Sequence, residues 1–265
     1  MQRDVTSTLV LDISETSDMV ASMSAVAMPG LTITETLTAT LDGMPIAVHE
    51  VLDAHGTRLH HLVTGVGQLT IDYAAHIEGR ANPISVSELD ELRYLRPSRY
   101  AESDALARTA AGEFPGLTGR EALDAVVDWV SRRLEYVPGS SVQTDGAIAT
   151  MLARQGVCRD YAHLTVGLLR SLNVPARLVS VYAPGLSPMD FHAVCEALVD
   201  GQWLLVDSTH LAPRESMLRV ATGRDAADTA FLTTKTGNPV LVDMRITAVV
   251  DELPNEDWSA DIALG

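Results

Sequence analysis

Two cysteines, Cys158 and Cys195, are the residues of this 265-residue chain best suited to nucleophilic chemistry. Cys158 follows Gly156 and opens a segment, 158–172, in which apolar residues recur every three or four positions, as is typical of a helix. The unpaired N–H groups and the positive dipole end of a helix N-terminus stabilise a thiolate. The sequence therefore predicts a reactive thiol at Cys158.

A base and a carboxylate suited to assist this thiol follow it along the chain. His192 lies 34 residues after Cys158, and Asp207 lies 15 residues after His192, on two expected strands joined by the turn Asp200-Gly201. Side chains on two such strands become cross-strand neighbours, whereas strand alternation turns Cys195 away from His192. In acyl transfer, Cys158 would attack a carbonyl, His192 would move the thiol proton and Asp207 would fix the imidazole.

An oxyanion formed at Cys158 needs hydrogen-bond donors, and the backbone N–H of Cys158 is the first candidate. Gln143 and Gln155 are upstream amides of a suitable type for a second donor, and the sequence does not choose between them. Two polar neighbours are expected to be structural. His163 lies about 140° round the helix from Cys158, and Asp160 complements the helix dipole.

A zinc site is the main alternative use of these side chains. It would draw on Cys158, His163, His192, Cys195 and His210, which lack the short paired spacings of zinc ligands. Two cysteines are also too few for a disulfide framework, and a disulfide between them is not expected in the cytoplasm. The sequence therefore predicts neither a metal nor another cofactor.

Composition and charge indicate which binding partners and which cellular location to expect for this protein. The formal net charge of −16 disfavours binding to nucleic acids and anionic membranes, which relies on clustered Lys and Arg. Residues 1–6 lack the features of a secretory signal, and the longest weakly polar run, 19–28, has about half of the ~20 residues that a spanning helix requires. We therefore expect a globular protein of the cytoplasm.

The first part of the chain favours antiparallel strands. Leu31–Thr40 alternates at period two before the turn pair Asp42-Gly43, which predicts a hairpin. Similar patterns of β-forming residues occupy the segments 8–13, 46–52, 59–63 and 68–77. We expect an N-terminal, β-sandwich-like domain over residues 1–90.

Helical patterns replace the strands after Asn82-Pro83. An apolar stripe at Leu123, Val126 and Val130 predicts a helix behind Thr118, and further helices are expected at 87–95, 103–113, 146–154 and 158–172. Strand patterns return at 176–182, 192–199, 202–207 and 240–250. We expect a second domain, 91–265, in which helices pack on an antiparallel sheet.

Several of these segments resemble the core of bacterial transglutaminase-like cysteine peptidases. The similarity rests on Gly-Val-Cys-Arg-Asp-Tyr-Ala-His-Leu at 156–164, Val-Pro-Ala-Arg at 174–177, Phe-His-Ala at 191–193 and Trp-Leu-Leu-Val-Asp-Ser-Thr at 203–209, within roughly 92–210. The resemblance implies an α+β, papain-like core in which Cys158, His192 and Asp207 form a catalytic triad.

The resemblance indicates the mechanism more closely than the reaction, because such families include proteases, amidases, cross-linking enzymes and proteins without a known substrate. Val157 and Arg159 flank Cys158, where the animal cross-linking enzymes have a Gln-Cys-Trp arrangement. We therefore expect hydrolysis of peptide or amide bonds in a peptide or protein substrate, through a thioester. Acyl transfer to an amine, and a non-catalytic binding module that retains the fold, remain as alternatives.

Overall fold

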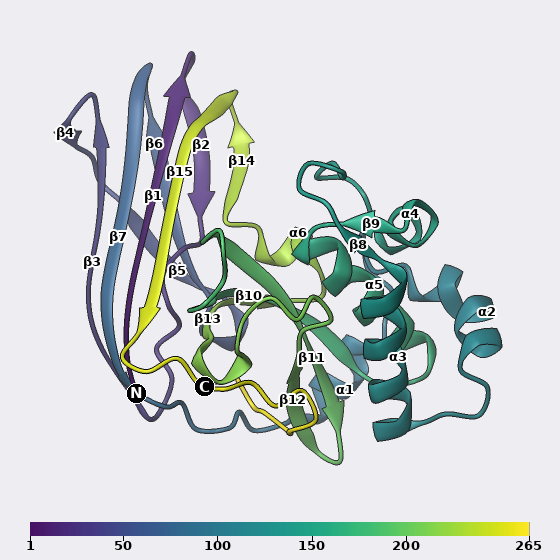
Figure 1. The fold of residues 1–265 in the computed structure, drawn as a ribbon. Coiled ribbons are helices and arrows are strands. Elements are labelled where there is room, and N and C mark those ends of the chain that lie inside the picture. The colour runs from purple at the N-terminus through teal and green to yellow at the C-terminus, as the bar shows by residue number, and fades with distance from the viewer. Residues whose placement is uncertain (265) are drawn as a thin grey trace.

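Two antiparallel sheets pack on each other at one end of the molecule in the computed structural model, which describes residues 1–264 (Figure 1). Leu9 and Leu11 of the larger sheet share a buried core with Met19 and Leu62 of the smaller sheet. The larger sheet has the order β15-β1-β7-β3-β4, with β1 at Gln2–Ile13, β3 at Leu31–Leu41, β4 at Met44–Pro45, β7 at Gly67–Gly79 and β15 at Pro239–Val250. The smaller has the order β14-β2-β6-β5, with β2 at Ser17–Ala21, β5 at His49–Leu52, β6 at Arg58–Thr64 and β14 at Leu232–Thr236.

Strands from both the N-terminal and the C-terminal parts of the chain pair in this β region. β15 pairs antiparallel with β1 along its whole length, from Arg3 opposite Val250 to Ile13 opposite Pro239, and β14 pairs with β2 (Figure 1). The structure therefore differs from the expected division at residue 90, because chain from 232 to 250 completes the N-terminal sheets. A period-two pattern marks a segment as a strand but does not identify the strand beside it.

A second layer of structure joins helices to a third sheet, which has the order β12-β11-β10-β13. Its strands are β10 (Ala176–Tyr182), β11 (Phe191–Val199), β12 (Gln202–Val206) and β13 (Leu218–Gly223). The helices are α1 (Glu88–Tyr94), α2 (Ser103–Glu113), α3 (Gly119–Arg133), α4 (Ala147–Ala153), α5 (Cys158–Ser171) and α6 (Ala226–Thr229), and a short parallel pair joins β8 (Glu135–Tyr136) to β9 (Gln155–Gly156). This arrangement confirms the expected α+β fold class. Among residues 1–264, no helix is long and apolar enough to cross a membrane.

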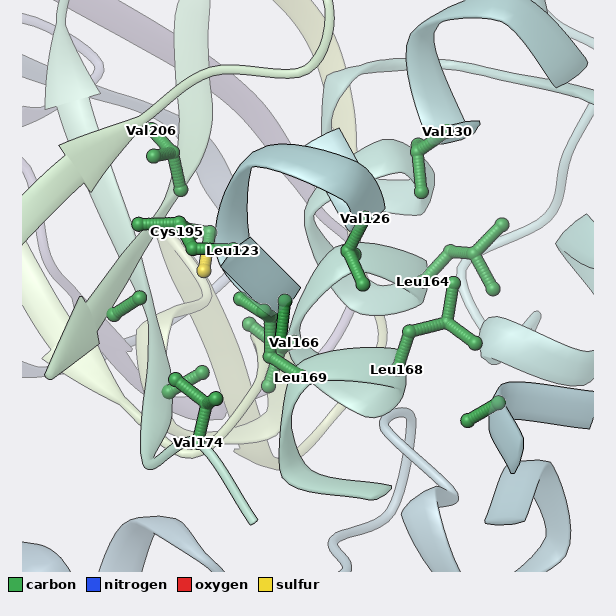
Figure 2. Close-up of a cluster of buried hydrophobic side chains, with 14 of the residues drawn as sticks. Leu123, Val126, Val130, Leu164, Val166, Leu168, Leu169, Val174, Cys195 and Val206 are labelled. Atoms are coloured by element: carbon green, nitrogen blue, oxygen red, sulfur yellow. The ribbon is translucent and has the colours of Figure 1, made fainter. Parts of the chain in front are cut away.

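Helix α5 is the centre of the second core. Figure 2 shows Val126 of α3 near Leu164 and Leu168 of α5, and Leu123 of α3 next to Cys195 of β11 at the sheet side of the same cluster. All five side chains are almost completely buried. Burying each large apolar side chain contributes about 1.5–3 kcal/mol, so α3 and the sheet together hold α5 firmly in place.

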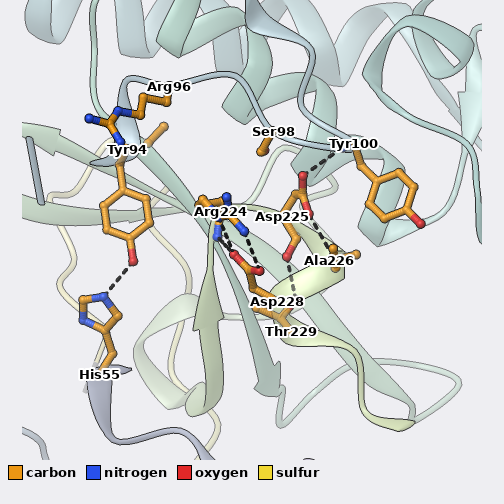
Figure 3. Close-up of polar contacts among 12 residues, drawn as sticks. His55, Tyr94, Arg96, Ser98, Tyr100, Arg224, Asp225, Ala226, Asp228 and Thr229 are labelled. Carbon is orange, nitrogen blue, oxygen red and sulfur yellow. Dashed lines mark hydrogen bonds and ion pairs between the residues drawn. The ribbon is translucent and has the colours of Figure 1, made fainter. Parts of the chain in front are cut away.

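Hydrogen bonds tie the connector between the β region and the helices to its surroundings (Figure 3). The Tyr94 hydroxyl lies 2.6 Å from His55 Nε2, and the Tyr100 N–H donates to Asp225 at 2.8 Å. From α5, buried Arg170 donates to the Arg96 carbonyl at 3.0 Å. The helix that begins at Cys158 is therefore fixed to the connector as well as to the sheet.

Candidate active site

The backbone around Gly156 places Cys158 at the first position of α5. Val157 is extended before the helix, and its N–H donates to the Asp160 carboxylate at 2.8 Å. A side chain at Gly156 would not fit, because a Cβ there would lie 2.7 Å from the Asp160 Cβ. Asp160 therefore caps the helix, in agreement with its expected structural role, and the Cys158 thiol stays half-buried at the helix N-terminus.

His192 and Asp207 form a buried pair on β11 and at the end of β12. His192 Nε2 lies 2.7 Å from Asp207 Oδ2, and the other carboxylate oxygen accepts hydrogen bonds from the Thr209 N–H at 2.9 Å and the Thr209 hydroxyl at 2.7 Å. Both oxygens of Asp207 are thus engaged. The imidazole is held with Nε2 toward the carboxylate, and Nδ1 has no nitrogen or oxygen partner.

The Cys158 thiol supplies the remaining contact of the imidazole. Burial alone would lower the pKa of His192, but the Asp207 carboxylate and a hydrogen bond with the Cys158 thiol raise this pKa to about 10. Burial would raise the pKa of Asp207, and His192 together with Thr209 lowers it instead. At neutral pH the pair therefore carries a protonated imidazole and an ionised carboxylate, and a protonated imidazole stabilises a thiolate beside it.

The structure separates Cys195 from this group. Cys195 packs among the residues that face α3 and α5, whereas Val194, on the face that alternation gives to His192, packs in a different cluster with Val179 and Val181. Cys195 is 2% exposed, and burial raises the pKa of its thiol. Figure 2 shows its sulfur inside the apolar core. Only one of the two cysteines therefore meets a base.

His163 also lies away from the thiol. Its Nε2 accepts a hydrogen bond from the Ala226 N–H at 3.1 Å, and its ring stacks on Tyr100. Burial lowers the pKa of His163 to about 4, so the ring is neutral at neutral pH. This is the structural histidine that the helix geometry predicts. Within the described part of the chain, no group of three His, Cys, Asp or Glu side chains is arranged to hold a metal ion.

Tyr136 is the residue beside Cys158 that sequence reasoning missed. The parallel pairing of β8 with β9 sets Tyr136 opposite Gly156, and the next residue, Val137, donates its N–H to the Gly156 carbonyl at 3.0 Å. The Tyr136 hydroxyl accepts a hydrogen bond from the Cys158 N–H and also bonds the thiol. Burial, reinforced by the thiol, raises the pKa of Tyr136, so the hydroxyl keeps its proton.

The two glutamines considered as oxyanion donors are both exposed. Gln155 belongs to β9, and Gln143 lies in the loop before α4. Tyr136 stands nearer to the place where an oxyanion would form, since it already bonds the Cys158 N–H. In the sequence, Tyr136 is recognisable only as a β-forming residue shortly after the 119–133 helix. Nothing in that pattern indicates that it contacts Cys158.

A cavity of about 330 Å³ lies behind Asp207. It opens between α3, the end of β12 and the segment 258–262, and His210 and Arg214 also border it. Neither Cys158 nor His192 lines it. The cavity therefore borders the carboxylate end of the site and not the thiol end.

Comparison with known proteins agrees with this geometry. Residues 105–208, which include Cys158, His192 and Asp207, match the Transglutaminase-like superfamily. The solved structure of a proposed cysteine protease from Cytophaga hutchinsonii is similar over 100% of this chain and 96% of that chain, with a TM-score of 0.89 and 29% identity.

An uncharacterized protein of Mycobacterium leprae (strain TN) is 31% identical over 125 residues. That match spans 43% of this chain and 43% of the relative, so less than half of the relative's length is represented. The matched family and the full-length structural likeness confirm the resemblance found in the sequence. Residues 105–208 therefore form a transglutaminase-like domain.

Proposed function

We propose that this protein is a cysteine-dependent hydrolase that cleaves peptide or amide bonds through a thioester. The observation that carries the proposal is the buried His192–Asp207 pair beside the Cys158 thiol at a helix N-terminus. Such an arrangement combines an activated nucleophile with a base that a third group orients. The substrate is a peptide or protein, and we place the reaction in the cytoplasm.

In the first step the Cys158 sulfur attacks the carbonyl carbon, and the carbonyl electrons move onto oxygen. When the tetrahedral intermediate collapses, the C–N bond breaks and the leaving amine takes the proton held at His192 Nδ1. The Cys158 acyl thioester remains. His192 then removes a proton from water, which attacks the thioester, releases the carboxylic acid and returns the thiol proton to the enzyme.

Asp207 acts through His192. It bonds Nε2 at 2.7 Å, and Thr209 fixes the carboxylate in turn. This keeps Nδ1 toward the thiol and stabilises the imidazolium that forms while the proton is in transit.

Tyr136 and the Cys158 N–H would stabilise the oxyanion. In the free protein the Tyr136 hydroxyl accepts a hydrogen bond from the Cys158 N–H. A substrate carbonyl must therefore displace the hydroxyl from this N–H. The hydroxyl can then donate its own proton in a hydrogen bond to the oxyanion. Removal of one oxyanion donor costs about 10²–10³-fold in rate. Tyr136→Phe should therefore slow amide cleavage by about 10²-fold or more, and slow alkylation of Cys158, which forms no oxyanion, far less. Equal losses in both assays would contradict this role.

The test of the function uses the cell's own peptides as substrates. Wild type and Cys158→Ala are incubated with the same peptide extract, and mass spectrometry identifies products that appear with wild type alone. Acid quenching should trap an acyl adduct on the Cys158 peptide. Cleavage that is equal in both samples, with no adduct, would contradict the proposal.

An assay with and without an added amine distinguishes hydrolysis from acyl transfer. With a glutamine-containing peptide, hydrolysis yields the acid whether or not an amine such as putrescine is present. Predominant formation of the amine conjugate would instead establish the alternative reaction of the same thioester.

A further inference from the structure

A buried hydrogen bond joins the helix of the candidate nucleophile to the turn that carries Asp207. The hydroxyl oxygen of Thr165, in α5, lies 2.8 Å from the hydroxyl oxygen of Ser208, the residue directly after Asp207. The two residues are 1% and 5% exposed, so water does not compete for either hydroxyl. Neither hydroxyl takes part in the chemical steps proposed above.

The donor and the acceptor of this hydrogen bond can be assigned. Thr165 also donates its hydroxyl to the carbonyl of Tyr161, one turn earlier in α5, at 2.8 Å. A hydroxyl has a single hydrogen to donate, and its two lone pairs accept. Thr165 therefore accepts the hydrogen bond from Ser208. Loss of the Thr165 oxygen would leave the buried Ser208 hydroxyl without this partner.

The turn at 207–209 therefore contacts both halves of the candidate site. Asp207 lies 2.7 Å from His192 Nε2, and the Thr209 hydroxyl donates to the other oxygen of the same carboxylate at 2.7 Å. Ser208, between these two residues, bonds α5. Three consecutive side chains thus connect the imidazole, the carboxylate and the helix that carries the thiol.

Helix α5 transmits the contact at Thr165 to Cys158. Thr165 follows Cys158 by seven residues, which places the two about 20° apart round the helix and about 10 Å apart along its axis. They therefore lie on the same face, two turns apart. The residues from Asp160 to Arg170 are buried, so a displacement of α5 at Thr165 would move Cys158 with it.

Apolar packing defines the position of α5 less sharply than this hydrogen bond does. Val166 and Leu169 of α5 belong to the same core as Val206 of β12 (Figure 2). Hydrophobic contacts are non-directional, whereas a hydrogen bond weakens steeply outside a narrow range of distance and angle. The bond between Thr165 and Ser208 is therefore suited to fix α5 along the sheet.

On the basis of the proposed hydrolase function, we infer that Thr165 and Ser208 are positioning residues that hold the Cys158 thiol against the imidazole. Thr165 acts through α5, and Ser208 acts through Asp207 and its bond to His192. Without this hydrogen bond the thiol lies less well against the imidazolium, which then stabilises the thiolate less. A displacement of about 1 Å far from the reacting atoms can lower a catalysed rate by about 10²-fold.

The pH dependence of Cys158 alkylation tests the inference without a known substrate. Rates with iodoacetamide are measured between about pH 5 and about pH 9.5, and mass spectrometry follows the Cys158 peptide. In Thr165→Val the rate at about pH 6 should fall by about tenfold, as it does when the midpoint of the profile rises by about one pH unit. At about pH 9.5, where a thiol ionises without help, the rates should agree within about twofold. Thr165→Ser, which keeps the acceptor oxygen, should follow wild type.

A second variant and a matched control complete the set. Ser208→Ala removes the donor and should move the midpoint in the same direction as Thr165→Val. Thr150→Val is the control, because Thr150 is 3% exposed and its hydroxyl donates to the Gly146 carbonyl at 3.1 Å, the same backbone spacing as for Thr165. The control should leave the profile of the folded protein unchanged.

The outcomes separate this inference from the proposed function. A wild-type midpoint below that of free cysteine, with the same midpoint in folded Thr165→Val and Ser208→Ala, overturns the positioning role and leaves the proposed function standing. A wild-type profile that coincides with that of free cysteine contradicts the activated thiol, and the inference with it. An equal shift in Thr150→Val also overturns the inference, because the profile would then report general loosening. Circular dichroism checks folding, and if Thr165→Val does not fold, Ser208→Ala decides the question.

Discussion

Strand β11 carries two buried ionic groups on one face, and they differ in the side chains that lie beside them. His192 pairs with Asp207 at 2.7 Å, and four residues later Glu196 bonds Arg177 at 2.7 Å and Arg219 at 2.6 Å. All of these side chains are almost completely buried. Burial and ion pairing are therefore common to both groups and do not by themselves mark a site of reaction.

The difference lies in the neighbours. The carboxylate of Glu196 is held by two guanidinium groups, and Arg177 lies over the Trp203 ring at 3.8 Å. The guanidinium nitrogens of this cluster that have no hydrogen-bond partner belong to buried arginines, which are not nucleophiles. His192 keeps one nitrogen, Nδ1, for the half-buried Cys158 thiol. A buried pair becomes chemically useful when one of its members faces a reactive group that substrate can reach. We therefore expect Glu196 to contribute to stability and His192 to reactivity.

Glu196→Gln should give the largest change in stability. The substitution leaves two buried guanidinium groups without their shared carboxylate, and breaking such a network costs about 3–5 kcal/mol. Urea unfolding followed by circular dichroism measures the loss. The folded fraction should alkylate Cys158 at the wild-type rate, and a large loss of reactivity in folded protein would contradict the division of roles.

The two groups should respond to opposite ends of the pH range. The pKa of His192 is raised from 6.5 to about 10, so its contribution to stability is complete below pH 6.5 and is lost as the pH rises toward 10. The pKa of Glu196 is lowered from 4.5 to about 2 because the guanidinium groups outweigh burial, so its contribution is present above pH 4.5 and is lost as the pH falls toward 2.

Unfolding free energies of wild type, His192→Gln and Glu196→Gln measured against pH test this prediction. The gap between wild type and His192→Gln should narrow by an amount on the order of a few kcal/mol between pH 6.5 and 10. The gap for Glu196→Gln should stay constant there and narrow only in acid. Gaps that change together would show that the two groups are not independent.

Asp207→Asn should have a smaller effect than Glu196→Gln or His192→Gln, and we expect to see it in the alkylation rate of Cys158. The amide cannot stabilise the imidazolium as the carboxylate does, and we expect alkylation of Cys158 at neutral pH to slow by about tenfold. Asp200→Asn is the matched control, because it makes the same substitution in an exposed turn. If both variants react at the wild-type rate, Asp207 has no part in activating the thiol.

Local sequence patterns predicted much of the fold. The alternation at 31–40 and the stripe at Leu123, Val126 and Val130 each correspond to an observed element, β3 and α3. Each pattern is contained in one segment, so neighbouring residues suffice to identify it. The pairing of β15 with β1 joins residues more than 200 positions apart, and no local pattern encodes the partner.

The residues of the candidate site also fall into those that a local motif predicts and those that it does not. Cys158, His192 and Asp207 stand in short motifs, and the structure brings the three side chains together. Tyr136 has no motif and reaches Cys158 only because β8 pairs with β9. His60 of β6 is 2% exposed and lies 2.8 Å from the Ser24 hydroxyl, a burial that no local motif predicts. Contacts that arise from tertiary packing were the ones the sequence did not predict.

The rate of Cys158 alkylation in His192→Ala shows whether His192 activates the thiol. Iodoacetamide is applied at about pH 7 to wild type, His192→Ala and the control His49→Ala, which changes an exposed histidine of β5. We expect wild type and His49→Ala to react faster than free cysteine. His192→Ala should be slower than wild type by about ten- to thirtyfold, since an unassisted thiol is only a few per cent ionised at this pH. Equal rates in wild type and His192→Ala would contradict this expectation.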